Sequence, residues 1–464
     1  MIVFINYIYT ADRKVGLKQM CPTIRKAYFD HSSTSVPKAP GVADRMTNYL
    51  DTGAYSIGRG GYAASLNIAQ EILEARELIA ELFNAADPRE VIFTPSLTYA
   101  LNIILSGFLR EGDHVITTSM EHNSVMRPLY ALKQQRGISY DPVQCDSEGA
   151  LYPEDILPLI RSNTKAIVMT HASNVCGTVL PIQEVAKLCK QRDIRLIVDA
   201  AQTAGVLPID ASDIDALAFP GHKGLLGPTG IGGFIVKSDF AKQLNPILWG
   251  GTGSLSQGFK QPDFLPDKFE SGTMNIAGIL GLKAALAYLK EAGCESIYQH
   301  EMQLYEHFIS EARTIKGMNL VGAGRVAERN IGVSQQAPQM AISEVSGSRD
   351  EDLLNTPIFL SADTYGQTSH IQKVPVVSMD FPHHDNANIA AALDKQYGIM
   401  ARCGLHCAPA AHKTLGTFPQ GTVRLSFGHA NTLEEVDYLL ESLKGLLSDG
   451  SKNISTTKGI THGV

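Results

Sequence analysis

The sequence predicts an α/β protein built around a mostly parallel sheet. Two observations lead to this prediction: short, fully apolar runs recur along residues 40–285, and helical patterns lie between several of them. Strands that are apolar throughout are typical of a sheet covered by helices on both faces, which favours parallel pairing. The chain has 464 residues, too many for one small core, so we expect two domains.

The elements of the first region follow in order. A helix is expected over 68–83, where apolar residues recur on one face, and another over 182–192. Turn residues bound each of the short apolar runs, which we interpret as strands at 91–93, 115–116, 166–169, 196–198, 216–219 and 233–236.

A second region begins near residue 286, with helices expected about 278–315 and 432–447 and strands near 373–381 and 421–427. Residues 322–372 are polar and weakly periodic, which indicates an insertion. Residues 448–464 are rich in Ser, Thr, Gly and Lys, which predicts a disordered tail. We therefore predict a large domain at 40–285 and a small domain formed by 1–39 and 286–447.

Composition excludes several classes of protein. The net charge is −7 and no run of Lys or Arg occurs, which argues against a nucleic-acid surface. No segment is long and apolar enough to span a membrane, and residues 1–19 lack the basic start of a signal peptide, so we interpret them as an extension. The seven scattered cysteines do not form a disulfide framework and favour a cytoplasmic protein.

Two local patterns could suggest a nucleotide site and a metal site, but neither has the full signature. Residues 322–327 formally match a dinucleotide fingerprint, but no clear helix follows them, so a loop is expected. The spacing of Cys403, His406, Cys407 and His412 does not match a common zinc site, so no metal is predicted.

Polar clusters directly follow four of the expected strands, at residues 121–123, 171–174, 199–202 and 221–224. Taken singly, such residues have structural explanations: Asp199 can cap a helix and His122 can be a satisfied core residue. The carboxyl ends of parallel strands, however, meet at one edge of a sheet. A shared site that holds His122, Asp199 and Lys223 is therefore the better interpretation.

An aspartate and a lysine in such a site indicate pyridoxal 5'-phosphate. This cofactor needs a lysine amine for its Schiff base and an acid beside its pyridine nitrogen. It also needs donors for its phosphate, ideally at a helix N-terminus. Residues 94–98 lie between a strand and an apolar helical run that starts near Tyr99, and they offer such donors.

At this point the chain resembles the class V aminotransferase-fold family of cysteine desulfurases and selenocysteine lyases. The resemblance covers about 28–320 and 374–446, and its motifs lie in the right order. They are residues 28–31, 120–122, 171–178, 198–202, 221–223, 227–232, 269–275 and 402–409. It implies the fold of type I pyridoxal-phosphate-dependent transferases, with a mostly parallel, seven-stranded-type sheet in the large domain and a smaller α+β domain.

The resemblance also implies a role for each matching residue. Lys223 would be the Schiff-base lysine and proton shuttle, Asp199 the partner of the pyridinium, and Gln202 a neighbour of the ring hydroxyl. The remaining cofactor contacts would be His122 stacked on the ring, Thr98 and His222 at the phosphate, Thr273 from the neighbouring subunit of a homodimer, and Asn174. Asn174 and Arg424 would also bind the substrate carboxylate, which suits a guanidinium fork.

Cys407 resembles a catalytic nucleophile, since it ends an Arg-x-Gly-x-His-Cys pattern that begins at Arg402. A loop rich in Gly, Pro and His, with Arg402 and His406 nearby, favours an accessible thiolate. The resemblance then implies conversion of L-cysteine to L-alanine, with sulfur kept as a persulfide on Cys407 and passed to an acceptor protein.

Other functions remain open at this stage. They are a selenocysteine lyase, another pyridoxal-phosphate-dependent C–S lyase, epimerase or aminotransferase of the same fold, and a non-catalytic relative that binds a partner. The chain also departs from the family's usual pattern. Pro220 stands where a hydroxyl residue is usual at the phosphate, and residues 95–97 are bulkier than the common Gly and Ala. Proline offers neither a hydroxyl nor an N–H, so one phosphate contact is expected to be missing.

Overall fold

The computed structural model describes residues 26–57, 60–255, 257–323 and 371–448. Residues 1–19 fall outside this range, as do most of the insertion expected at 322–372 and most of the fingerprint at 322–327. The tail expected at 448–464 is outside it too, apart from Ser448. No helix among the described residues is long and apolar enough to cross a membrane.

The larger part of the fold, called the large layer below, is a seven-stranded sheet with the helices that cover it. The strand order is β2-β8-β7-β6-β5-β3-β4, and only β8 is antiparallel to its neighbours. This confirms the mostly parallel sheet. The strands are β2 (Val91–Thr94), β3 (His114–Thr118), β4 (Ser139–Val143), β5 (Thr164–Thr170), β6 (Arg195–Asp199), β7 (Ala216–Pro220) and β8 (Gly232–Val236). The sequence pattern missed β4, which carries Pro142 and has a half-exposed surface.

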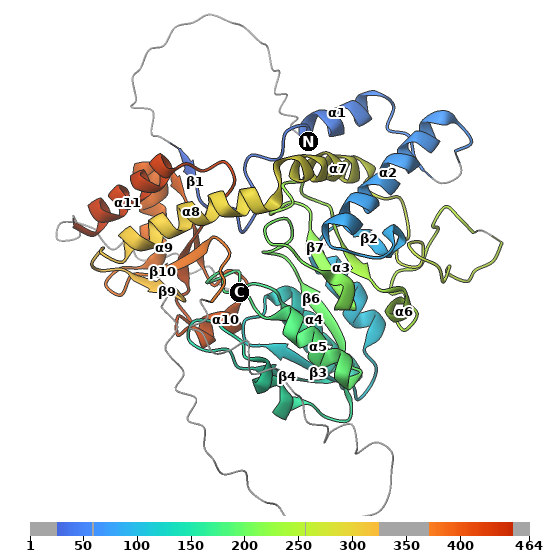
Figure 1. Ribbon diagram of the computed structural model, residues 1–464, viewed down its shortest axis with the longest axis horizontal. Helices are drawn as coiled ribbons and strands as arrows, with labels where there is room; N and C mark the ends of the chain where they lie inside the picture. Colours follow the sequence, from blue (N-terminus) through green and yellow to red (C-terminus); the bar gives the residue numbers. More distant parts are fainter. Residues whose placement is uncertain (1–25, 58–59, 256, 324–370, 449–464) are drawn as a thin grey trace, which may run out of the picture.

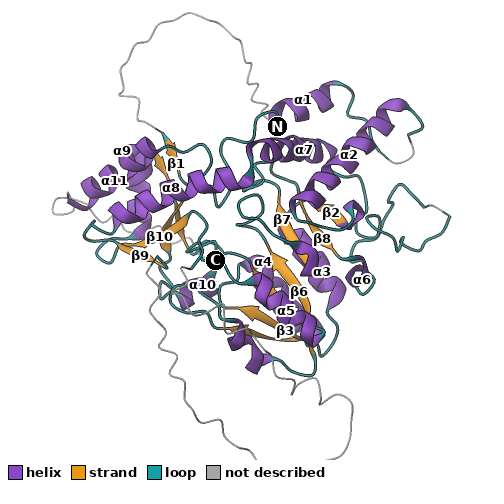
Figure 2. Ribbon diagram, viewed as in Figure 1, coloured by secondary structure: helices purple, strands orange, loops and turns teal. Residues whose placement is uncertain are grey.

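Alternation along the strands divides the core between the two faces of this sheet. Leu196 and Val198 point to one face and Ile197 to the other. The first face is covered by α1 (Val42–Asp51), α2 (Ala63–Leu82), α5 (Ile182–Arg192) and α7 (Ile276–Ala292). The second face is covered by α3 (Leu97–Phe108), α4 (Asn123–Arg136) and the short α6 (Ser238–Ala241). Figures 1 and 2 show strands enclosed by these helices.

The expected helical stretch at 278–315 is two helices, because Gly293 (φ +80°) ends α7 and α8 (Cys294–Ala312) begins after it. Figure 1 shows α8 leading away from α7 toward a second group of strands. This is a four-stranded antiparallel sheet in the order β12-β13-β10-β9. Its strands are β9 (Asn319–Val321), β10 (Val376–Asp380), β12 (Arg402–Gly404) and β13 (Thr422–Ser426).

The four-stranded sheet and its helices form the second, small layer, which has its own apolar core. The helices are α8, α9 (Asn386–Tyr397) and α11 (Leu433–Ser448). The short α10 (Pro409–Thr414) follows β12. Near the chain start, β1 (Ala27–Tyr28) pairs with β11 (Ile399–Met400) and Phe29 enters this second core. The division into two domains, with limits at residues 39, 285 and 447, stays a prediction.

The two layers meet beside the ends of β5 and β10. Gly177 (φ +72°) lies so close to the small layer that an added Cβ would stand 2.6 Å from the Val374 carbonyl oxygen. Its own carbonyl accepts a hydrogen bond from the Val374 N–H (2.8 Å). Ala172, Val206 and Val376 form a small apolar cluster at the same junction. The loop after β5 is therefore fitted directly against the second layer.

Candidate active site

The carboxyl ends of β3, β5, β6 and β7 meet at one edge of the large sheet, as the sequence predicts. A cavity of about 200 Å³ lies there. It is lined by Ser96, Leu97, Thr98, His122, Ser124, Thr170, Ala172, Asn174, Asp199, Ala201, Gln202, Pro220, His222 and Lys223. Seven of the predicted site residues are in this set: Thr98, His122, Asn174, Asp199, Gln202, His222 and Lys223.

Asp199 is the last residue of β6 and is 1% exposed. Its two carboxylate oxygens accept hydrogen bonds from the Ala201 N–H (2.8 Å) and the Ser124 hydroxyl (3.1 Å). Burial raises the pKa of this carboxyl above its ordinary value, and the Ala201 N–H and the charge of Lys223 oppose that rise. A cationic ring nitrogen in the cavity would stabilise the buried carboxylate further.

Lys223 follows β7 after a tight turn and points into the same cavity as Asp199. Desolvation lowers the pKa of its amine to about 8, although the Asp199 carboxylate raises it. The nearby guanidinium groups of Arg424 and Arg402 lower it again. A sizeable neutral fraction at physiological pH makes this amine a competent nucleophile and base.

His122 caps the start of α4, because its Nδ1 accepts the Ser124 N–H (3.0 Å). Nδ1 therefore carries no proton, and the neutral ring is protonated at Nε2. Burial and the charge of Lys223 lower the His122 pKa to about 4. Ser124 joins this imidazole to Asp199, a role that the sequence analysis missed. No local signal indicated it, because Asp199 lies 75 residues farther along the chain.

Part of the cavity lining suits a phosphate group. Ser96 caps α3, so the first N–H groups of that helix face the cavity wall formed by Ser96, Leu97 and Thr98. The Nδ1 of His222 is buried and has no hydrogen-bond partner within the described chain. Pro220 lines the cavity too, and it contributes no donor there.

Together these residues fit pyridoxal 5'-phosphate. A buried carboxylate, an amine with a lowered pKa and a helix N-terminus lie around one cavity, and His222 offers an unused ring nitrogen beside them. Gln202 lines the same cavity and donates to the Ser32 carbonyl (3.3 Å).

Three predicted site residues lie outside the cavity lining. Arg424 is 2% exposed and donates from Nη2 to Asp30 (2.7 Å) and Ser33 (2.9 Å). Its Nη1 donates to the Asn174 carbonyl (3.0 Å), so this guanidinium is bonded to both Asp30 and the loop after β5. Asp30 lies in one of the segments that carry the family resemblance, but the sequence pattern predicts no role for it. Thr273 is exposed and does not line this chain's own cavity.

Cys407, the third, is exposed. It lies in the turn between β12 and α10, and its carbonyl accepts a hydrogen bond from the Asn123 N–H (2.8 Å), next to His122. Asn174 approaches the same turn, because its Nδ2 donates to the His406 carbonyl (2.8 Å). Asn174 is therefore bonded to the cysteine turn as well as facing the cavity.

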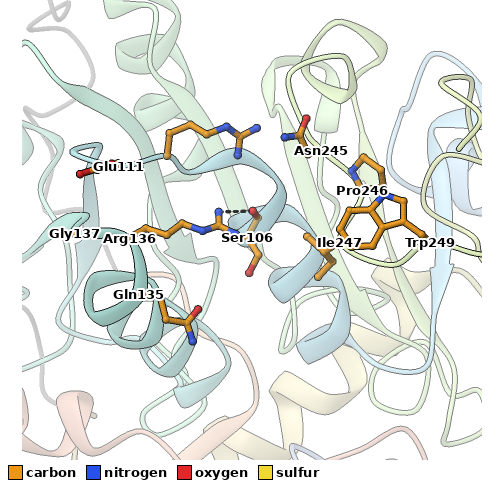
Figure 3. A pocket seen from close by; sticks show the side chains of 10 residues that line it. Ser106, Glu111, Gln135, Arg136, Gly137, Asn245, Pro246, Ile247 and Trp249 are labelled. Atoms are coloured by element: carbon orange, nitrogen blue, oxygen red, sulfur yellow. Dashed lines mark hydrogen bonds between the residues drawn. The ribbon is translucent and has the colours of Figure 1, made fainter. Parts of the chain in front are cut away.

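A larger surface pocket, of about 630 Å³, contains none of the predicted site residues. Figure 3 shows Arg136 bonded to Ser106 on one side of it, and Pro246 and Trp249 on the other. One guanidinium nitrogen of Arg136 already donates to the Ser106 and Leu109 carbonyls (2.7 Å each). This pocket therefore lacks the convergent reactive groups of the Lys223 cavity.

Comparison with known proteins identifies the family. The aminotransferase class-V family model matches residues 27–346 and 359–439. The chain belongs to the class-V aminotransferase family. A probable cysteine desulfurase of Methanothermobacter thermautotrophicus is 31% identical to it over 94% of this chain and 99% of its own length. A cysteine desulfurase of Yersinia pseudotuberculosis is 30% identical over 90% of this chain and 92% of its own.

Solved structures agree with this class-V aminotransferase assignment. The apo cysteine desulfurase of Thermococcus onnurineus superposes with a TM-score of 0.76 at 29% identity, covering 91% of this chain and 94% of that one. The cysteine desulfurase CsdA of Escherichia coli, in an S-sulfonic acid form, superposes with a TM-score of 0.73 at 25% identity over the same shares of the two chains. The predicted type I fold is confirmed.

Proposed function

We propose that this class-V aminotransferase is a cysteine desulfurase that converts L-cysteine to L-alanine and keeps the sulfur as a persulfide on Cys407. The observation that carries the proposal is the meeting of the Lys223–Asp199 cavity with the Cys407 turn, joined through Asn123 and Asn174. Relatives that match nearly the whole chain and are named cysteine desulfurases support it.

We assign the cavity to pyridoxal 5'-phosphate, with Lys223 as the covalent attachment, Asp199 at the ring nitrogen, Gln202 near the ring hydroxyl and His122 stacked on the ring. Thr98, His222 and the first turn of α3 would hold the phosphate, with Asn174 as a further neighbour. When bound, the cofactor supplies an electron sink for the negative charge that develops at the substrate Cα.

The protein's own groups would perform the remaining steps. The amine of Lys223 removes the Cα proton and later returns a proton to that carbon, and Cβ gains the proton that the Cys407 thiol gives up. Arg424 and Asn174 orient the substrate carboxylate. The Cys407 sulfur attacks the substrate sulfur, so the Cβ–S bond breaks as the S–S bond forms. L-Cysteine and one thiol thus give L-alanine and one persulfide, with atoms and electrons in balance.

The proposed enzyme is a homodimer in which Thr273 completes the phosphate site of the neighbouring subunit. This agrees with the exposure of Thr273, which does not line the cavity of its own chain. A sulfur-acceptor protein would receive the persulfide, which requires the exposure that Cys407 has. A cytoplasmic location is proposed from the free cysteines.

The test incubates the protein with L-cysteine and dithiothreitol and measures alanine and sulfide. We expect equal amounts of both from the wild type, and at least a hundredfold loss in Cys407→Ser with the cofactor absorbance unchanged. Cys403→Ser is the matched control, since Cys403 is half-buried on β12 and burial raises its pKa to about 11. Full activity in Cys407→Ser would refute the role of Cys407. A parallel L-selenocysteine assay tests the lyase alternative.

A further inference from the structure

The turn that carries Cys407 has an unusual backbone. His406 (φ +48°) and Cys407 (φ +56°) both adopt the left-handed conformation, which residues other than glycine rarely do. Two such residues in succession persist only where the surrounding structure holds them. His406 is 4% exposed, whereas the cysteine beside it is open to solvent. The fold therefore buries one residue of the turn and presents the next.

A chain of hydrogen bonds leads from the His406 ring into the protein. Its Nε2 bonds with the Thr422 hydroxyl on β13 (3.0 Å). That hydroxyl donates to the Ser378 hydroxyl on β10 (2.9 Å), which donates to the Val175 carbonyl in the loop after β5 (2.7 Å). Thr422 and Ser378 are both fully buried. This series of hydrogen bonds runs from the small layer to the large one without reaching solvent.

Counting the hydroxyl protons fixes which group donates in each of these hydrogen bonds. A hydroxyl has one proton, and Ser378 gives its proton to the Val175 carbonyl. Thr422 must then donate to Ser378, which leaves it only as an acceptor for His406. His406 is therefore the donor, protonated at Nε2. Burial lowers the His406 pKa to about 2, so the ring is neutral and its Nδ1 carries a lone pair.

The backbone of the same residue is bonded to the same loop. Asn174, next to Val175, donates from Nδ2 to the His406 carbonyl (2.8 Å). His406 is thus held at its ring and at its carbonyl, and both connections end at residues 174–175. This is a closed circuit of side-chain and main-chain bonds around the residue that precedes the cysteine.

We propose that this circuit positions the Cys407 thiol for sulfur transfer, with His406, Thr422 and Ser378 as positioning residues that act through the turn. The proposal rests on the proposed function, because it requires Cys407 to be the sulfur acceptor. None of the three needs to touch substrate or cofactor. Since small misplacements of a reacting atom slow a reaction strongly, loss of the circuit should reduce turnover more than binding.

Thr422→Val removes the hydroxyl and keeps the branched shape. We expect kcat for alanine formation to fall about tenfold, with KM for L-cysteine within about twofold of wild type. The absorbance of the bound cofactor, and its change on adding L-cysteine, should match the wild type. The rate of Cys407 alkylation by iodoacetamide, followed on the Cys407 peptide by mass spectrometry, should change at least threefold. Thr422→Ser restores the hydroxyl and should restore both rates.

The matched control is Thr164→Val. Thr164 is a buried residue of β5 whose hydroxyl also bonds with a buried histidine ring, His114 (2.8 Å), at the end of the strand remote from the cavity. This variant should lose stability comparably, measured by thermal unfolding, while keeping wild-type kcat and the wild-type alkylation rate. Ser378→Ala breaks the next bond of the circuit, and it serves if Thr422→Val does not fold.

Two results would overturn the positioning proposal. One is wild-type kcat and Cys407 alkylation in folded Thr422→Val, or in Ser378→Ala when the first variant does not fold. The other is an equal loss of kcat in Thr164→Val, which would indicate general destabilisation. Failure of the proposed function appears differently. In that case wild-type protein loaded with cofactor forms no alanine from L-cysteine, or Cys407→Ser remains fully active, whatever the variants of Thr422 do.

Discussion

At the scale of single residues, the site is governed by desolvation. Lys223 and His122 are both held less basic than usual by burial, and Asp199 is held less acidic. Charges then adjust this trend: Asp199 favours the protonated form of Lys223, and Arg424 disfavours it. Lys223 therefore titrates near physiological pH. Beside it lies Asp199, whose carboxylate form a cationic ring would stabilise.

One prediction concerns the pH dependence of cofactor attachment. Only the neutral amine of Lys223 can attack an aldehyde, and its neutral fraction rises as the pH increases through the pKa of about 8. The rate at which cofactor-free protein takes up pyridoxal 5'-phosphate should therefore rise between about pH 7 and 9 and then level off. Stopped-flow absorbance measures this rate.

The Asp199→Asn variant provides the control for this titration. Asp199 raises the pKa of Lys223, so its loss should move the midpoint to lower pH. An uptake rate that still climbs above pH 10 would contradict the lowered pKa. Peptide mapping after borohydride reduction should find the cofactor on Lys223 in the wild type.

At the scale of elements, function depends on how closely the two layers approach. Gly177 has a positive φ and faces carbonyl oxygens of Val374 and Val376 at distances too short for a Cβ atom. We predict that Gly177→Ala destabilises the protein by about 3 kcal/mol and lowers activity at least tenfold, because the loop carrying Asn174 must move. Urea unfolding and alanine release measure the two effects.

Gly112 offers a control for the free-energy cost of a positive φ alone. Its φ of +76° is nearly the same, but an added Cβ there would meet nothing within 4 Å. Gly112→Ala should cost about 1 kcal/mol with full activity. Equal costs at the two glycines would show that the approach of the layers is not what requires Gly177.

Helix α8 contains a second element-scale feature, the buried Glu301. Desolvation raises its pKa to about 8, although a backbone N–H of His429 opposes the rise. A carboxyl with a raised folded-state pKa contributes stability that is complete below its unfolded pKa and is lost as the pH rises toward 8. The contribution of Glu301 to wild-type stability should therefore decline between about pH 4.5 and 8.

Glu301→Gln keeps the shape and removes this titration. Compared with wild type, the variant should gain about 4 kcal/mol of relative stability between pH 4.5 and pH 8. Urea unfolding at both values measures the change. The same difference between variant and wild type at the two pH values would contradict a raised Glu301 pKa.

At the scale of the whole molecule, an exposed apolar loop lies near the second surface pocket. Its large side chains at the surface are Leu248, Trp249, Leu255, Phe259 and Phe264. Contiguous exposed apolar groups are typical of interaction surfaces. This loop precedes Thr273, the residue that we assign to the neighbouring subunit, so the homodimer would cover it.

We predict a particle of about twice 50.2 kDa in light scattering after size exclusion. Trp249 is the single tryptophan and is 72% exposed in the isolated chain, so it reports the interface directly. Its emission should shift to longer wavelength on dilution to monomer. Phe259→Asp should weaken the dimer. Tyr130→Asp, at an exposed position of α4, should not. A monomer at micromolar concentration would refute the predicted interface.

Most of the large layer could be predicted from sequence because its signals are local. Short apolar runs bounded by turn residues located β5, β6 and β7, a helical pattern located α5, and strand ends indicated where Asp199 and Lys223 meet. The pattern did not reveal β4, which is largely half-exposed, or the short β11 and β12, whose pairing depends on distant strands.

The sequence by itself determined the α/β class, the parallel sheet and the reactive groups at its edge, since apolar periodicity and strand ends are properties of neighbouring residues. Only the tertiary structure decided that Asn174 is bonded to the cysteine turn, that Arg424 is paired with Asp30, and that His406 is held by Thr422 and Ser378. These bonds join residues up to 394 positions apart, and no local pattern specifies which distant polar groups will share a buried space.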